Sequence, residues 1–150
     1  MSRFAVVAVA HVQDNDPEFA HGVVARAGVR ANPDDLGITR SILEVMQRFN
    51  HPFSIITKSV LIARDADILG SMGKAGLATA FVSITTLDRG LARAMEPRAS
   101  TPAKRLEAIR RLAEAGVPVG VGFAPVIPGL NDHELEAILE AAAKAGATTA

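Results

Sequence analysis

Helical segments alternate with short apolar runs along this chain, and each helix ends on the same signal. Four times a charged residue and an alanine precede a glycine that opens a new segment, at Gly28, Gly76, Gly116 and Gly146. Glycine readily adopts the left-handed backbone conformation that closes a helix. Helices and strands that alternate in this way favour parallel pairing through right-handed crossovers. The sequence therefore predicts an α/β fold, a parallel sheet with alternating helices.

The hydrophobic periodicity and the end signals place the individual elements. The Thr101 hydroxyl is expected to cap a helix that has Pro102 in its first position, and Asn131 with Glu134 has the spacing of a capping box. The other expected helices cover residues 16–27, 38–50, 65–75 and 87–95, the strands cover 4–12, 53–57, 78–85 and 117–124, and a loop covers 29–37. Because no linker composition separates these segments, we expect a single domain over residues 1–150.

Composition excludes several classes of function. The chain has no cysteine, so it contains no disulfide, no thiol nucleophile and no cysteine ligand for an iron–sulfur cluster. Sixteen basic and sixteen acidic residues cancel, which gives no indication of nucleic-acid or membrane binding. The apolar stretch over residues 4–10 is too short to span a bilayer and lacks the features of a signal peptide. A cytoplasmic location is the default expectation.

The candidate site residues follow the expected strands, because parallel β/α folds gather ligands at the carboxyl ends of their strands. Lys58 can bind an anion or form a Schiff base, or it is simply a solvated lysine. Asn131 most simply caps a helix. We expect no metal site, since His133 and Glu134 have no metal-ligand spacing, and Asp65 and Asp67 are expected to face solvent. The remaining candidates are Ser83, Thr85 and Thr86, which are also good strand formers, and Arg98, which is otherwise an exposed turn residue.

An ordered set of motifs from about residue 37 onward resembles the central barrel segment of radical S-adenosylmethionine (SAM) enzymes, in the subgroup related to spore photoproduct lyase. The motifs are Ile38-Thr39-Arg40-Ser41, Ser54-Ile55-Ile56-Thr57-Lys58-Ser59, Val82-Ser83-Ile84-Thr85-Thr86-Leu87-Asp88, Glu96-Pro97-Arg98, Arg105-Leu106-Glu107-Ala108-Ile109 and Pro125-Val126-Ile127-Pro128-Gly129-Leu130-Asn131-Asp132. Residues 1–36 carry no such motif.

The resemblance implies an incomplete, TIM-like β/α barrel of six units that binds SAM at its mouth. A reduced [4Fe-4S] cluster would cleave SAM to a 5′-deoxyadenosyl radical. Lys58 and Ser83 would lie near the methionyl or ribose groups, and Arg98 would be a further polar contact. Residues 126–131 would border the adenine. The implied cofactor-binding residues are Lys58, Ser83, Thr85, Arg98, Ile127 and Asn131.

The chain departs from that family in three respects. It lacks the Cys-x3-Cys-x2-Cys motif that holds the cluster, it lacks the Gly- and Asn-rich segment expected before Ile38, and it stops at Ala150 where another strand would follow. We therefore expect a truncated, split or rearranged relative that is inactive alone. The alternatives are a Schiff-base lyase that uses Lys58, or a non-catalytic α/β module that binds a nucleotide-like ligand or a partner chain. Such a module would self-associate or pair with a complementing chain.

Overall fold

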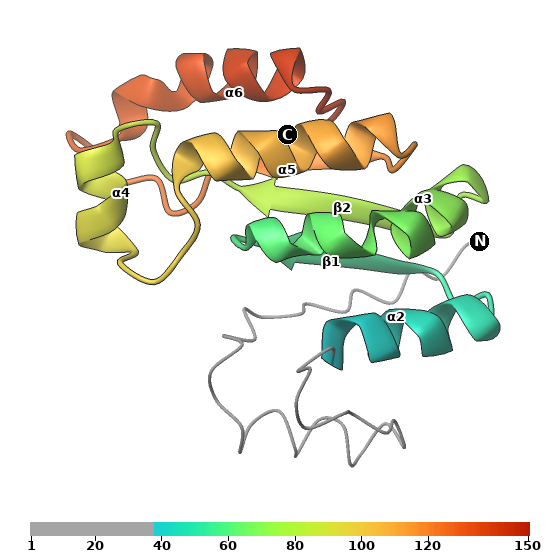
Figure 1. Cartoon of the computed structure of the whole chain (residues 1–150). Helices are drawn as coiled ribbons and strands as arrows, with labels where there is room; N and C mark the ends of the chain where they lie inside the picture. Colours follow the sequence, from blue (N-terminus) through green and yellow to red (C-terminus); the bar gives the residue numbers. More distant parts are fainter. Residues whose placement is uncertain (1–37) are drawn as a thin grey trace.

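The computed structural model describes residues 38–150 as helices packed on a small parallel sheet (Figure 1). The strand and helix expected within residues 4–27, the loop over 29–37 and the helix end at Gly28 lie outside the described residues. The helices are α2 (Ile38–Arg48), α3 (Ala66–Lys74), α4 (Arg89–Met95), α5 (Pro102–Glu114) and α6 (Leu135–Lys144), with 3₁₀ turns at Val60–Asp65 and Asp132–Glu134. The strands are β1 (Phe53–Thr57), β2 (Ala78–Ser83) and β3 (Val119–Gly122).

The three strands form one parallel sheet in the order β1-β2-β3. Ile55 pairs with Ala80 on one side of β2, and Val82 pairs with Val121 on the other. A parallel bridge between Gly120 and Thr149 continues the sheet beyond β3. The predicted α/β class with a parallel sheet and alternating helices is confirmed. The described sheet is open, which agrees with a partial barrel.

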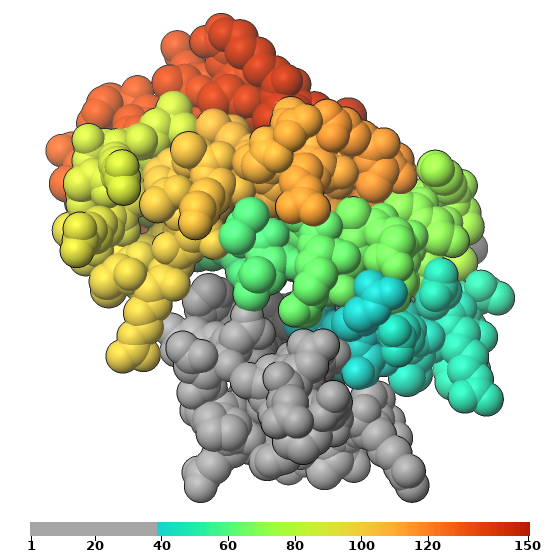
Figure 2. All heavy atoms as spheres, in the orientation of Figure 1, coloured from blue at the N-terminus to red at the C-terminus, as the bar shows by residue number. Residues whose placement is uncertain are grey.

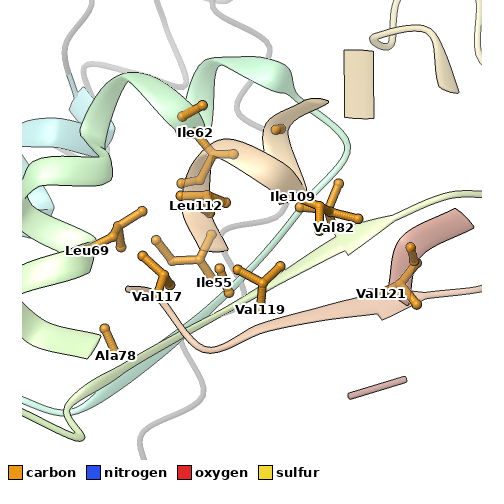
Figure 3. Close-up of a cluster of buried hydrophobic side chains, with 14 of the residues drawn as sticks. Ile55, Ile62, Leu69, Ala78, Val82, Ile109, Leu112, Val117, Val119 and Val121 are labelled. Atoms are coloured by element: carbon orange, nitrogen blue, oxygen red, sulfur yellow. The ribbon is translucent and has the colours of Figure 1, made fainter. Parts of the chain in front are cut away.

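An aliphatic core lies between one face of the sheet and helices α3 and α5 (Figure 3). Alternate strand residues such as Ile55, Val82 and Val119 point into this core, because side chains along a strand alternate between its two faces. Leu69 of α3 and Leu112 of α5 cover them and are fully buried. Burial of such side chains stabilises the fold by about 1.5–3 kcal/mol each.

The predicted glycine signals are confirmed at three helix ends. Gly76, Gly116 and Gly146 have φ angles of 70°, 86° and 104°, which an L side chain adopts only with strain. Each returns the chain from a helix toward the sheet. Among the 113 described residues no helix is long and apolar enough to cross a membrane.

Two local expectations were wrong. Thr101 precedes α5 as predicted, but its side chain makes no capping hydrogen bond. Asp65 was expected to face solvent, yet it is only 1% exposed; it directly precedes α3, and Arg40 of α2 donates to its carboxylate at 3.3 Å. Burial raises the pKa of Asp65, although Arg64 and Arg40 oppose the shift.

Replacing Gly70 by alanine is expected to destabilise the protein. A Cβ atom at this position in α3 would lie 2.4 Å from the backbone oxygen of Ala115, so the two segments must move apart. We expect a loss of about 1–3 kcal/mol despite the better helix propensity of alanine. Urea unfolding would measure the loss, with Ser71→Ala on the exposed side of α3 as the matched control. A Gly70→Ala variant as stable as the control would contradict this close approach.

Candidate functional site

Polar side chains gather where the strands end. The arrowheads of β1 and β2 point toward the end of the molecule that carries α4 (Figure 1). Lys58 directly follows β1, Thr85 follows β2, and Glu96 is the residue that ends α4. Figure 2 shows α4 and the segment leading to α5 forming the surface at this end. Because the strands are parallel, segments distant in the sequence meet at one edge of the sheet.

The carboxylate of Glu96 is the centre of this group. The ammonium of Lys58 pairs with Oε1, and the Thr85 hydroxyl lies 2.9 Å from the same oxygen. The guanidinium of Arg105 in α5 pairs with Oε2. The side chains of Arg105, Glu96 and Lys58 are 2%, 13% and 29% exposed, so burial decreases from the guanidinium to the ammonium. We call Lys58, Thr85, Glu96 and Arg105 the Glu96 cluster.

Arg105 ties the cluster to two further segments. Its Nη1 donates to the carbonyl of Ser83 at 2.9 Å, and its Nε donates to the carbonyl of Ser100 at 2.7 Å. These bonds satisfy a buried guanidinium whose charge would otherwise be very unfavourable. The end of β2, the end of α4 and the start of α5 are therefore held together through one side chain.

The cluster favours an ionised Glu96. Burial alone raises the pKa of this carboxyl, but hydrogen bonds from Lys58, Arg105 and Thr85 outweigh burial, and the net pKa lies below its ordinary value. With Lys58 and Arg105 as cations, the cluster carries one net positive charge. It can therefore attract a single anionic group such as a carboxylate.

Asn131 fastens the loop between β3 and α6 to the end of β2. Its Nδ2 donates to the carbonyls of Thr85 at 2.8 Å and Pro125 at 2.9 Å, while Oδ1 accepts from the backbone N–H of Ile127 at 2.7 Å. The residue is fully buried and makes no capping bond with its side chain, so the predicted helix cap was wrong. The side-chain NH₂ group donates instead to the carbonyl of Thr85 after β2 and to that of Pro125 in the loop.

Glu134 is bound to the same strand end. Its carboxylate accepts from the Thr86 hydroxyl, and from the backbone N–H of Leu87 at 2.7 Å. The expected capping box between Asn131 and Glu134 is therefore not formed. The side chains of both residues instead bind the turn after β2, about 47 positions earlier in the sequence. Asn131 and Glu134 together fix the turn after β2 against the loop that precedes α6.

The structure connects five of the six predicted cofactor-binding residues and leaves Arg98 apart. Lys58 and Thr85 belong to the Glu96 cluster, and Ser83 and Asn131 join it through the Ser83 and Thr85 carbonyls. Ile127 contributes its backbone N–H to Asn131. Arg98 is exposed and makes no hydrogen bond or ion pair within residues 38–150. Their role in cofactor binding stays a prediction.

The sequence reasoning missed Glu96 and Arg105 as site residues. A signal existed for Arg105, which shares helical spacing with Ala108, Ile109 and Leu112 and so lies on the buried face of α5. A buried arginine requires an acidic partner, and Glu96 lies nine residues upstream. In the Glu96-Pro97-Arg98 motif, only Arg98 was predicted as a site residue.

The donor set does not fit an iron–sulfur cluster. No cysteine occurs in the 150 residues, and the part of the chain that the structure describes holds no group of three His, Asp or Glu side chains arranged around a common point. Cluster irons require thiolate ligands, with histidine as an occasional substitute. By contrast, a partly exposed ammonium in a net positive cluster suits a ligand with a carboxylate.

The comparisons with known proteins identify a family. The model of the Radical SAM superfamily matches residues 25–142, a span that begins before residue 37, where the family-like part was expected to start. An uncharacterized protein of Acidianus two-tailed virus is 40% identical over 90 residues, which cover 60% of this chain and 29% of the relative. An uncharacterized protein of Mycobacterium tuberculosis (strain ATCC 25618 / H37Rv) is 35% identical over 99 residues, which cover 65% and 29%.

A third relative, an uncharacterized protein of Methanocaldococcus jannaschii, is 30% identical over 100 residues, which cover 67% of this chain and 37% of the relative. The chain thus spans between 29% and 37% of the length of these curated relatives.

Proposed function

The chain belongs to the radical SAM superfamily, and on this basis we propose that its strand ends form part of an S-adenosylmethionine site. The ammonium of Lys58 binds the carboxylate of SAM. Ser83 and Thr85 lie on the methionyl or ribose side, Arg98 is a further polar contact, and Ile127 lies near the adenine. The observation that carries the proposal is the convergence of Lys58, Thr85 and Glu96 at one edge of the sheet, inside the family-matched span.

Charge and shape support this assignment. The Glu96 cluster carries a single net positive charge, which matches one carboxylate. The loop over residues 126–131 presents the exposed apolar side chains Val126 and Leu130, which suit the flat face of a nucleobase. The Asn131 amide bonds both the loop and the carbonyl of Thr85, so its role is to hold this loop against the end of β2.

The proposed SAM site does not include the iron–sulfur cluster, because these 150 residues contain no cysteine to bind it. In this family bound SAM supplies an adenosyl group for radical chemistry. We propose that the cluster ligands come from outside these 150 residues, from the same polypeptide or from a complementing chain, and that the chain alone is inactive. Anaerobic reconstitution with iron and sulfide is expected to give no stoichiometric [4Fe-4S] absorption.

The motif set supports a finer placement in the subgroup related to spore photoproduct lyase, and a cytoplasmic location remains our expectation from the sequence. A Schiff-base role for Lys58 is not favoured, since an ion-paired ammonium is a poor nucleophile.

Titration calorimetry with SAM tests the proposal. Lys58→Met is expected to weaken SAM binding by about 10- to 100-fold, the effect of losing one charge-assisted hydrogen bond. Lys74→Met is the control, because Lys74 is an exposed lysine at the end of α3. Decarboxylated SAM should bind more weakly to the unmodified chain and be insensitive to Lys58→Met. Equal SAM affinities for the two lysine variants would overturn the proposal.

A further inference from the structure

We propose that Glu96 is a positioning residue of this site: it holds the Lys58 ammonium in the place where the ligand carboxylate binds. This inference rests on the proposed function and adds to it a residue that makes no ligand contact itself. Glu96 is separated from Lys58 by 38 residues and comes from the end of α4, so only the tertiary structure joins them.

A lysine side chain is intrinsically mobile. A lysine that follows a strand carries four flexible methylene groups and loses considerable side-chain freedom when it is fixed on a ligand. In this structure the Glu96 carboxylate holds the ammonium through an ion pair made within the chain itself. The side-chain entropy lost in fixing Lys58 is then a cost of folding, and it does not reduce the affinity for the ligand.

Glu96 is itself held. Its Oε2 pairs with the buried guanidinium of Arg105, and the Thr85 hydroxyl lies 2.9 Å from its Oε1. A second contact joins the segment after β1, which carries Lys58, to the segment between α4 and α5. Here the backbone N–H of Val60 donates to Ser100 Oγ at 3.0 Å. The position of Lys58 is thus determined by a chain of contacts that begins in the core.

The Lys58 ammonium keeps donors for a ligand. An ammonium has three N–H donors, and within the described residues only Glu96 accepts from Lys58. The Lys58 side chain is 29% exposed, whereas that of Glu96 is 13% exposed. Because Arg105 balances the charge of Glu96, the carboxylate can orient Lys58 without neutralising the cluster.

A purely structural alternative makes a different prediction. If the Glu96–Arg105 pair only stabilises the fold, then Lys58 is an accessory to it and the charge of Glu96 does not affect the recognition of a carboxylate. If Glu96 positions Lys58, its removal weakens binding selectively for ligands that carry the carboxylate.

The test compares Glu96→Gln, which keeps the length but removes the charge, with Glu96→Asp, which keeps the charge on a shorter side chain. Glu107→Gln, an exposed glutamate of α5, is the control. We expect Glu96→Gln to weaken SAM binding about tenfold and to leave decarboxylated SAM unaffected, since the freed lysine must be ordered again. Glu96→Asp should restore part of the affinity. Unchanged SAM affinity in folded Glu96→Gln would overturn the inference.

A second measurement does not depend on the folding of any variant. The sequence has four lysines, at positions 58, 74, 104 and 144, so the ammonium groups of the ¹⁵N-labelled unmodified chain can be resolved by NMR. Lys58 is expected to have the most restricted Nζ. A Lys58 ammonium as mobile as that of Lys74 would refute the positioning role. Loss of SAM binding in Lys58→Met with full binding in Glu96→Gln would refute the inference alone, whereas no effect of Lys58→Met would refute the proposed function.

Discussion

Replacing Arg105 by methionine is expected to lower the free energy of unfolding by about 3–5 kcal/mol, because one partner of a buried ion pair is removed. The methionine fills similar space but donates no hydrogen bond. Glu96 then keeps Lys58 and Thr85 as partners but loses the buried guanidinium, and the carbonyls of Ser83 and Ser100 lose their donors. Urea unfolding of the two proteins at neutral pH measures the difference.

The matched control is Arg111→Met, an exposed arginine on the same helix, for which we expect a change within about 0.5 kcal/mol. The double variant Arg105→Met with Glu96→Gln should be more stable than the sum of the two single losses predicts, since it removes both charges of the buried pair. If Arg105→Met were as stable as the control, the Glu96 cluster would have no structural role.

Replacing Asn131 by alanine is expected to cost about 2–4 kcal/mol, because the buried carbonyl of Thr85, the partly buried carbonyl of Pro125 and the N–H of Ile127 lose their partner together. Asn131→Asp is expected to be at least as damaging, since it keeps the shape but presents oxygen atoms to two carbonyl oxygens. Chemical unfolding measures the loss, and hydrogen exchange at Ile127 should become faster in both variants.

His133→Ala is the control for this loop, since His133 is exposed two residues away. A small effect of Asn131→Ala, equal to that of the control, would show that the loop over residues 125–131 is held by other contacts. That outcome would also weaken the proposed role of this loop beside the adenine.

The charge of Glu96 also makes stability depend on pH. A carboxyl whose pKa is lower in the folded protein contributes stability above its ordinary pKa, and that contribution is lost as the pH falls through the folded value. The stability lost on Glu96→Gln should therefore become smaller as the solution is acidified below the ordinary glutamate range.

Much of the fold was determined by local sequence. Gly76, Gly116 and Gly146 end their helices because the left-handed conformation at those positions is a property of single residues. The apolar runs of β1 and β2 and the amphipathic pattern of α2 were likewise sufficient to predict an alternating α/β chain with parallel strands. The motifs pointed to the family that the comparison then showed.

The site was decided by the tertiary structure. Asn131 and Glu134 have the local spacing of a capping box, yet both bind the turn after β2, because buried carbonyls and N–H groups there require partners. Glu96 and Lys58 are in contact because the segments that follow parallel strands lie at the same edge of the sheet. No local sequence pattern predicts this contact, since the two residues are 38 positions apart. The sequence by itself thus determined where the backbone turns, while only long-range packing decided which polar side chains satisfy one another.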